Sequence, residues 1–153
     1  WSWNNKIILC ILRSSGALAA LGENPGLVHL RLATFTSGLL RSCAGSLIDE
    51  RWVLTSANCV RDIRFIWIRY GVVTVINPEL VTEASAARVN PDSNAALISI
   101  NRVVQSTANI RPYPLLQSGI AGDEARVCVF GATESGGKKK SIIIISIFNA
   151  AWY

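Results

Sequence analysis

Short apolar runs separated by turn-forming residues recur along the whole chain, and they predict β-strands. Several of the runs alternate apolar and polar positions with a period of two, as half-buried strands do. Glycine, proline and small polar residues stand between them, for example in the turn over residues 36–38 and at Asn77-Pro78. The runs cover residues 28–35, 39–48, 52–54, 65–70, 72–76, 82–89 and 142–148. The pattern therefore predicts an all-β protein.

Two of these runs predict a hairpin. Residues 46–48 and 52–54 are apolar, and the polar turn-forming segment over residues 49–51 lies between them. Gly71 separates residues 65–70 from residues 72–76 and predicts a bend or bulge between two strands. The alanines of residues 82–89 make that segment the poorest match to a strand.

Composition fits a single ordinary domain with a real core. The chain has 153 residues, of which 50% are apolar and 16% charged, which argues against disorder. Its net charge of +5 is modest, and Lys138-Lys139-Lys140 is best explained as a solvated loop. Nucleic-acid binding is not expected without a concentrated basic face. The sequence has no metal-ligand cluster or phosphate-binding glycine loop, so neither a metal nor another cofactor is expected.

Residues 1–19 are interpreted as a secretory signal peptide. Lys6 supplies the positive start, residues 7–12 are apolar, and Ala17-Leu18-Ala19 offers the small-x-small cleavage site. Arg13 interrupts the apolar run, and a first buried strand or helix of the mature chain is the alternative. The run is too short to span a bilayer. The interpretation predicts a secreted, extracellular protein without a membrane span.

Two cysteines frame the predicted hairpin. Cys43 and Cys59 stand at its ends, sixteen residues apart, where folding of the strands can bring them within disulfide reach. A zinc site is the alternative, but a lone pair of cysteines without a neighbouring Cys or His is poor for zinc.

The segment Cys43-Ala44-Gly45-Ser46-Leu47-Ile48, continued by Trp52-Val53-Leu54-Thr55-Ser56-Ala57-Asn58-Cys59, resembles the signature of the trypsin/chymotrypsin family. The resemblance implies that Cys43 and Cys59 form a disulfide. It also places Asn58 where the family has the histidine that acts as general base.

A second landmark, residues 90–100, resembles the family's segment around its buried catalytic aspartate. Aligning Ala96-Leu97-Ile98 places Asn94 at that aspartate's position. Asp92 is the alternative counterpart, because a two-residue slide keeps the side chain on the same face of a strand. The slide would spoil the match over residues 96–98, so we favour Asn94.

The rest of the resemblance concerns the family's two-barrel architecture. Residues 101–112 resemble the link between the barrels, and residues 126–133 resemble the opening strand of the second. We expect a first chymotrypsin-like antiparallel β-barrel over residues 20–112, then the linker and opening strands of an incomplete second barrel over residues 113–153. Cys128 matches a small residue of that strand and is expected to be a buried thiol. Ser135 does not match the family's nucleophile, because it follows Asn94 by only 41 residues.

The functional expectation is a secreted protease homologue without a catalytic triad, acting by protein binding or as a regulatory decoy. His29, the only histidine, is expected on a half-exposed strand face, and no Ile-Val-Gly-Gly start motif is present. A protein partner or self-association is expected at the strand carrying Ile142, Ile144, Ile147 and Phe148. The alternatives are a fragment or degraded form of a trypsin-like endopeptidase, and a structural or storage protein of a secretion.

Overall fold

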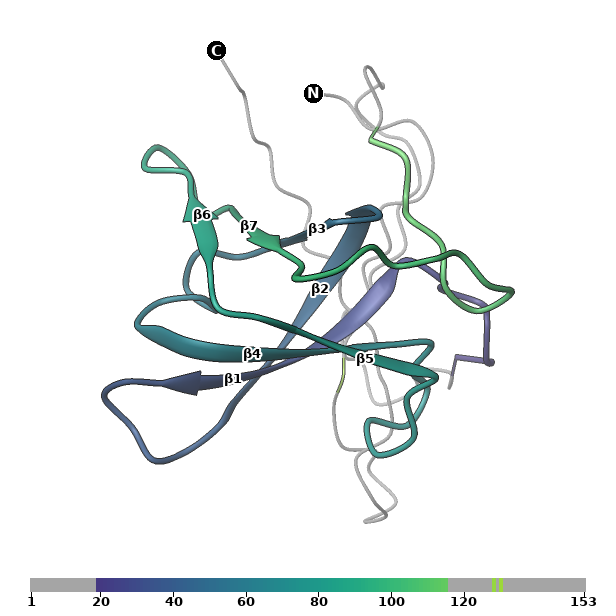
Figure 1. The fold of residues 1–153 in the computed structure, drawn as a ribbon, viewed down its shortest axis with the longest axis horizontal. Coiled ribbons are helices and arrows are strands. Elements are labelled where there is room, and N and C mark those ends of the chain that lie inside the picture. The colour runs from purple at the N-terminus through teal and green to yellow at the C-terminus, as the bar shows by residue number, and fades with distance from the viewer. Residues whose placement is uncertain (1–18, 116–127, 129, 131–153) are drawn as a thin grey trace.

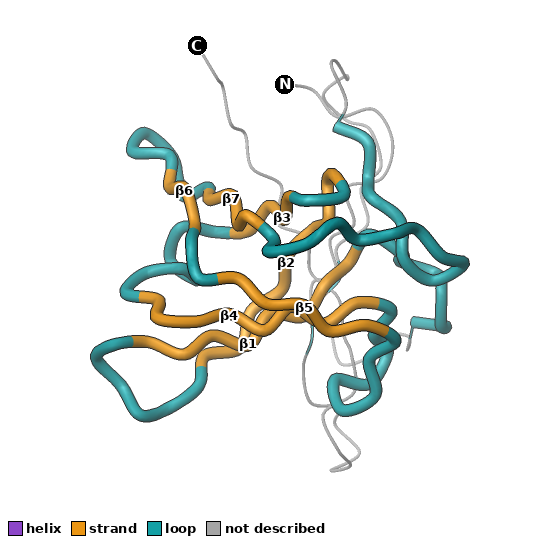
Figure 2. The backbone as a smooth tube through the Cα atoms, viewed as in Figure 1, coloured by secondary structure: helices purple, strands orange, loops and turns teal. Residues whose placement is uncertain are grey.

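The computed structural model describes residues 19–115, 128 and 130, and over these residues the protein is all-β. Seven antiparallel strands form one curled sheet (Figures 1 and 2). The strands are β1 (Leu27–Thr34), β2 (Arg41–Asp49), β3 (Trp52–Thr55), β4 (Ile63–Tyr70), β5 (Leu80–Ala84), β6 (Ala87–Val89) and β7 (Ala96–Ser99). Among the described residues, no helix is long and apolar enough to cross a membrane.

The order of strands in the sheet explains its curled shape. The neighbours run β5-β4-β1-β2-β3-β7-β6, so β5 and β6 stand at opposite edges although only two residues separate them in the chain. The sheet must therefore bend round until its edges approach each other, as the path from β5 into β6 shows in Figure 1. The backbone N–H of Asn101, just after β7, donates to the carbonyl of Glu83 on β5 and joins the two ends of the sheet. The result is an antiparallel barrel.

The alternation of side chains along each strand supplies the core. On β1, Val28, Leu30 and Leu32 are fully buried, and Ile66 and Ile68 of β4 meet them from the neighbouring strand. Leu47, Val53 and Ile98 continue the same cluster on β2, β3 and β7. Burial of each such side chain contributes about 1.5–3 kcal/mol relative to exposure in water. The period-two pattern in the sequence therefore becomes the inward face of the barrel.

Gly45 allows β2 and β3 to approach closely at the end of the hairpin away from its turn. It is buried, and a Cβ atom at this position would lie 2.7 Å from Cγ1 of Val53 and 3.2 Å from the carbonyl oxygen of Leu54. Any larger residue would have to push the two strands apart. The predicted hairpin is thus confirmed, with a register shift between Leu47 and Asp49 before the turn.

The predicted strand over residues 72–76 is wrong. Tyr70, the last residue of β4, pairs directly with Leu80, the first residue of β5, so the residues between them form the connecting loop. Gly71 adopts a φ of 60° and turns the chain out of the strand direction. The carbonyl of Val75 then accepts a hydrogen bond from Arg69 instead of pairing in a ladder. High β-propensity does not make a strand where no neighbouring strand is available.

The predicted strand over residues 82–89 divides into β5 and β6. Ser85 and Ala86 separate the two, and each half pairs with a different neighbour, β4 for β5 and β7 for β6. The break lets the chain pass from one edge of the sheet to the other. It is therefore the feature that closes the barrel.

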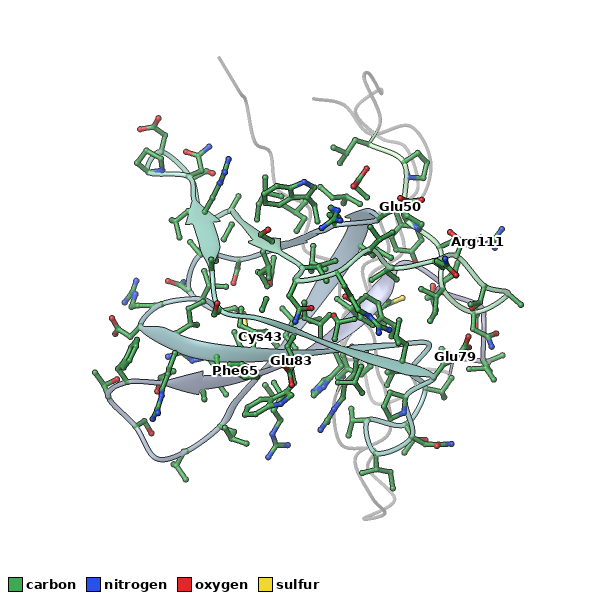
Figure 3. All side chains as sticks on the ribbon, viewed as in Figure 1. Cys43, Glu50, Phe65, Glu79, Glu83 and Arg111 are labelled. Atoms are coloured by element: carbon green, nitrogen blue, oxygen red, sulfur yellow. A yellow bond between two sulfur atoms is a disulfide. The ribbon has the colours of Figure 1, made fainter. Side chains whose placement is uncertain are left out.

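Glu79 attaches the β4–β5 loop to the segment that leaves the barrel. Its carboxylate accepts hydrogen bonds from Nδ2 of Asn109 at 2.8 Å and Oγ1 of Thr107 at 2.7 Å (Glu79 is labelled in Figure 3). These two hydrogen bonds lower the pKa of the Glu79 carboxyl, and the bond from Asn109 has the larger effect. The contacts hold residues 107–109 against the end of the barrel.

Tyr70 is expected to make the fold sensitive to alkali. Its ring is buried and its hydroxyl hydrogen-bonds Oγ1 of Thr82 at 2.8 Å. Burial raises the pKa of the Tyr70 phenol to about 12, against the lowering effects of Thr82 and of the charge on Arg102. Because the pKa of Tyr70 is higher in the folded than in the unfolded state, its contribution to the free energy of unfolding is fully present below about pH 10. That contribution is lost as the pH rises towards 12, and the loss is about 2–3 kcal/mol.

The measurement is the urea midpoint of wild type and of a Tyr70→Phe variant between pH 8 and pH 12. The variant loses one hydrogen bond at neutral pH, about 1 kcal/mol, but it carries no phenol to ionise at this site. The stability advantage of the wild type should therefore shrink above pH 10 and reverse as the pH approaches 12. An unchanged difference up to pH 12 would contradict the assignment.

Candidate functional site

The pairing of β3 with β7 brings Asn58 and Asn94 together. The end of β3, Thr55, pairs with the start of β7, Ala96, so the segments just outside both strands must meet. Asn58 follows this pair on one side and Asn94 precedes it on the other. The backbone N–H of Asn58 donates to Oδ1 of Asn94 at 3.0 Å, and the N–H of Ala57 donates to the carbonyl of Asn94 at 3.3 Å. Both asparagines are exposed to solvent.

Two arginines hold the turn that carries Asn58. Nη2 of Arg61 donates to the side-chain oxygen of Asn58 at 3.0 Å. Nη1 of Arg41 lies 2.9–3.1 Å from the carbonyl oxygens of Asn58, Cys59 and Arg61. Carbonyls that point together in this way at the end of a turn need a shared donor, and the guanidinium supplies it.

Arg41 was missed by sequence reasoning. It opens β2, far from Asn58 in the chain, and an arginine at the start of a strand is usually explained by solvation. The alternation of side chains along β2 could have indicated its role. Arg41 is two residues before Cys43, which packs against the core, so both side chains lie on the inward face of the strand.

A disulfide joins the same turn to β2, and this prediction is confirmed. Cys43 and Cys59 are bonded with an S–S distance of 2.06 Å and a Cα–Cα distance of 6.2 Å (Cys43 is labelled in Figure 3). The N–H of Cys59 also donates to the carbonyl of Ser56 at 3.1 Å, which closes a tight turn directly after β3. Asn58 is therefore held by a covalent bond, by a backbone turn and by two guanidinium groups.

Asp92 lies in a different setting from Asn94. Its backbone N–H donates to Oδ1 of Asn90 at 2.8 Å, which places it in an exposed turn before β7. Asn90 in turn donates its N–H to the carbonyl of Ala95. The residue that contacts the Asn58 turn is Asn94. Its correspondence to the family's aspartate stays a prediction.

His29 is buried, so the expectation of a half-exposed strand position is wrong. It lies on the outward face of β1, opposite Ala44, and is only 2% exposed. Phe130 covers it with ring centroids 5.0 Å apart and an interplanar angle of 82°. The outward face of β1 is thus covered here by the later part of the chain, which a strand pattern cannot reveal. Nε2 of His29 hydrogen-bonds Oγ of Ser42 at 2.7 Å.

The histidine and the Asn58 turn lie on opposite sides of the sheet. Cys43, which anchors the turn, packs against the inner core, whereas His29 points outward from the neighbouring strand. The imidazole fills the space between β1 and Phe130. Cys128, in the same cluster with Leu27, is buried as predicted.

Other predicted features lie outside the described residues. They are the signal peptide apart from Ala19, the strand with Ile142, Ile144, Ile147 and Phe148, and the segment with Ser135 and Lys138–Lys140. Within residues 19–115, 128 and 130, no group of three His, Cys, Asp or Glu residues could hold a metal ion.

The chemistry available at the Asn58–Asn94 corner is that of two neutral amides. An amide side chain donates and accepts hydrogen bonds, but it does not take up a proton near neutral pH. The two guanidinium groups beside it act as hydrogen-bond donors. The corner can therefore bind and orient polar groups.

Comparison with known proteins identifies the family to which this fold is similar. The family model described as trypsin matches residues 15–147. Serine protease SP24D of Anopheles gambiae is 29% identical over 139 residues, covering 84% of this chain and 49% of that protein. A collagenase of Hypoderma lineatum is 38% identical over 80 residues, covering 48% of this chain and 30% of that protein. The chain thus spans about half or less of the length of these relatives.

Two solved structures have the same fold. The HL collagenase structure has a TM-score of 0.61 at 32% identity, covering 67% of this chain and 47% of that one. A structure of GrC has a TM-score of 0.65 at 20% identity, covering 84% and 61%. The curled antiparallel sheet is therefore a chymotrypsin-like barrel. Because the family model matches most of this chain, the chain belongs to the trypsin family of serine proteases.

Proposed function

We propose that this chain is a non-catalytic trypsin-family homologue that acts by binding a protein, as a partner or a regulatory decoy. The observation that carries the proposal is the contact between Asn58 and Asn94 at 3.0 Å. In the family resemblance, these two positions are those of the general base and of the acid that orients it. Here the backbone N–H of Asn58 donates to the side-chain oxygen of Asn94, and both side chains are neutral amides.

Two amides cannot perform the proton transfers of the family mechanism. The base must accept a proton from the nucleophile and return it to the leaving group. Asn58 has no basic lone pair for this step, and its amide oxygen already accepts a hydrogen bond from Arg61. Loss of the histidine alone lowers turnover by about 10⁶ in subtilisin. We expect the substitution by itself to lower peptide hydrolysis by this route by a comparable factor.

The remaining histidine does not offer a substitute base. His29 is buried between β1 and Phe130, on the outward side of the sheet, and its Nε2 is engaged with Ser42. A general base has to reach the proton of a bound nucleophile within about 3 Å. The position of His29 supports a structural role for its ring.

Secretion is part of the proposal. The Cys43–Cys59 disulfide favours an oxidising compartment, where such bonds persist. The proposed signal peptide at residues 1–19 agrees with that location. We also propose the division into a first barrel over residues 20–112 and a partial second barrel after it, with the predicted strand over residues 142–148 as a site of association.

Restoring the histidine alone is expected to leave the chain inactive. An Asn58→His variant would regain a base. The side chain of Asn94 would still accept a hydrogen bond from the backbone, and it carries no negative charge to orient or stabilise the imidazolium. The 153 residues also contain no Gly-Asp-Ser-Gly-Gly segment. Wild type, Asn58→His and Asn58→Gln should show no hydrolysis of peptide or ester substrates above the uncatalysed rate.

The assay includes a serine-reactive inhibitor to separate true activity from contamination. Turnover by wild type that the inhibitor abolishes, and that follows the protein through purification, would overturn the non-catalytic role. The Asn58→Gln variant serves as the matched control, because it changes side-chain length without adding a base.

A second candidate is a fragment of a trypsin-like endopeptidase. The observation that favours it is the coverage of only 49% of the Anopheles gambiae relative. Intact-mass measurement of the natural protein distinguishes the two. A longer chain, or a second chain with a Gly-Asp-Ser-Gly-Gly segment, would support the endopeptidase.

A further inference from the structure

We propose that the outward face of β1, β4 and β5 binds a second copy of this chain around a two-fold axis. The proposal specifies one partner for the proposed binding role, but it uses no residue of the Asn58–Asn94 corner. Arg31, Phe65, Trp67, Val81 and Glu83 define this surface, called here the Trp67 face. Phe65 and Glu83 are labelled in Figure 3.

The register of the sheet places a cation, an indole and an anion in one row. Trp67 on β4 pairs with Arg31 on β1 on one side and with Glu83 on β5 on the other. Its neighbours Ile66 and Ile68 are fully buried, so Trp67 points outward. Neighbouring strands are about 4.8 Å apart, and the two charges therefore stand at similar distances on opposite sides of the indole.

Neither charge of this row is matched within the described part of the chain. The side chains of Arg31 and Glu83 make no hydrogen bond or ion pair with another described residue, and the carboxylate of Glu83 is exposed. Apolar surface adjoins them. Phe65 packs edge-on against Trp67 with ring centroids 4.8 Å apart, and Val81 is 45% exposed. One row along, the same outward side of β1 is covered by Phe130 at His29.

A row of this kind is complementary to itself. A two-fold axis that runs parallel to β4 through Trp67, in the plane of the contact, brings Trp67 onto Trp67 of the second copy. The same rotation exchanges the two sides of the row, so Arg31 faces the partner's Glu83, and Glu83 faces the partner's Arg31. Isologous contacts require this self-complementary arrangement. Phe65 likewise meets its own copy and extends the apolar centre of the interface.

Arg69 is the one like charge near the axis. It lies on the same side of β4 as Trp67, in the next row, but its Nη1 donates to the carbonyl of Val75 at 3.1 Å and draws the group toward the β4–β5 loop. Packed sheets also cross at about 30° because each is twisted. With the axis tilted from β4 by half of this angle, the copies of Arg69 move sideways from each other, and the copies of Phe65 do so equally, while the residues of the central row stay close to the axis.

The mixed charge of the face favours a second copy over a polyanion. A nucleic acid or sulfated glycan would place phosphate or sulfate against Glu83 as well as Arg31, and the repulsion would offset the attraction. The face is three strands wide, and stable interfaces bury about 1,200–2,000 Å² in total. We therefore expect a reversible dimer with a dissociation constant in the micromolar range.

Charge exchange tests the dimer. Sedimentation velocity from about 1 to 200 µM should show concentration-dependent dimerisation of the wild type. Arg31→Glu and Glu83→Arg should each weaken it at least tenfold, because each brings like charges together across the axis. The combined Arg31→Glu/Glu83→Arg variant should restore it to within about threefold. Arg51→Glu, an exposed charge change at the β2–β3 turn, should leave it unchanged.

Circular dichroism of each variant verifies that the sheet is intact. A wild type that stays monomeric throughout this range overturns the proposal, as does a dimer that neither single variant weakens or that the double variant fails to restore. Binding of an oligonucleotide or an acidic peptide at this face by a monomeric wild type would also overturn it. Because no substrate is involved, these results leave the absence of hydrolysis to be judged by its own assay.

Discussion

Replacing Leu30 by Ala is expected to lower the free energy of unfolding by about 2–5 kcal/mol. Leu30 lies at the middle of β1 and is fully buried, and its cross-strand partners are Cys43 on β2 and Ile68 on β4. Both neighbours are fixed, one by a disulfide and one by strand pairing, so the space left by the missing methyl groups cannot collapse. The loss is comparable to the whole stability of a marginal domain.

Urea unfolding followed by tryptophan fluorescence measures this loss. Leu39→Ala is the matched control, since it removes the same atoms at a position that is 81% exposed in the β1–β2 loop. Its effect should be below about 0.5 kcal/mol. Equal losses for the two variants would contradict the assignment of Leu30 to the core. If Leu30→Ala does not fold, the smaller Leu30→Val change provides the comparison.

Removal of the disulfide is expected to cost about 3 kcal/mol. The Cys43–Cys59 bond closes a loop with a sequence separation of 16, and the loop-entropy estimate for that length is about 3 kcal/mol. The double variant Cys43→Ala/Cys59→Ala should lose this amount in urea unfolding. Reduction of the wild type should reproduce the loss, and the same reductant should leave the double variant unchanged.

The disulfide variant should also loosen the Asn58–Asn94 corner. Hydrogen exchange at the amides of Ala57 and Asn58 reports this directly, because both donate to Asn94 in the folded chain. Arg41 and Arg61 would still hold the turn, so exchange should accelerate there without loss of protection in β1 and β4. Equal acceleration throughout the sheet would show that the bond acts only on global stability.

Much of the fold could be predicted because its information is local. The alternation around Leu30 and Leu32 marks an inward face whatever surrounds it, and the polar turn over residues 49–51 marks the hairpin of β2 and β3. The failure at residues 72–76 has the opposite cause. Val72, Val73 and Val75 have high β-propensity, but a strand also needs a partner, and Tyr70 had already paired with Leu80.

The sequence indicated which residues stand at the candidate site, but not which contacts they make with each other. Asn58 and Asn94 were identified through a family resemblance carried by the residues around them. Their hydrogen bond, across 36 positions of sequence, exists because β3 and β7 pair in one particular register. Arg41 was missed, since its three carbonyl partners come together only when the turn after β3 has formed.

The all-β class and the inward face of the strands could be read from the amino-acid sequence, as could the cysteines at 43 and 59 and the amides at 58 and 94. Period-two alternation and turn chemistry act between residues close in the chain, so they can be seen without a structure. Tertiary structure alone decided that His29 is buried and that Arg31, Trp67 and Glu83 form one row. Which residues become neighbours across strands depends on long-range register, and a repeat of two residues leaves that register open.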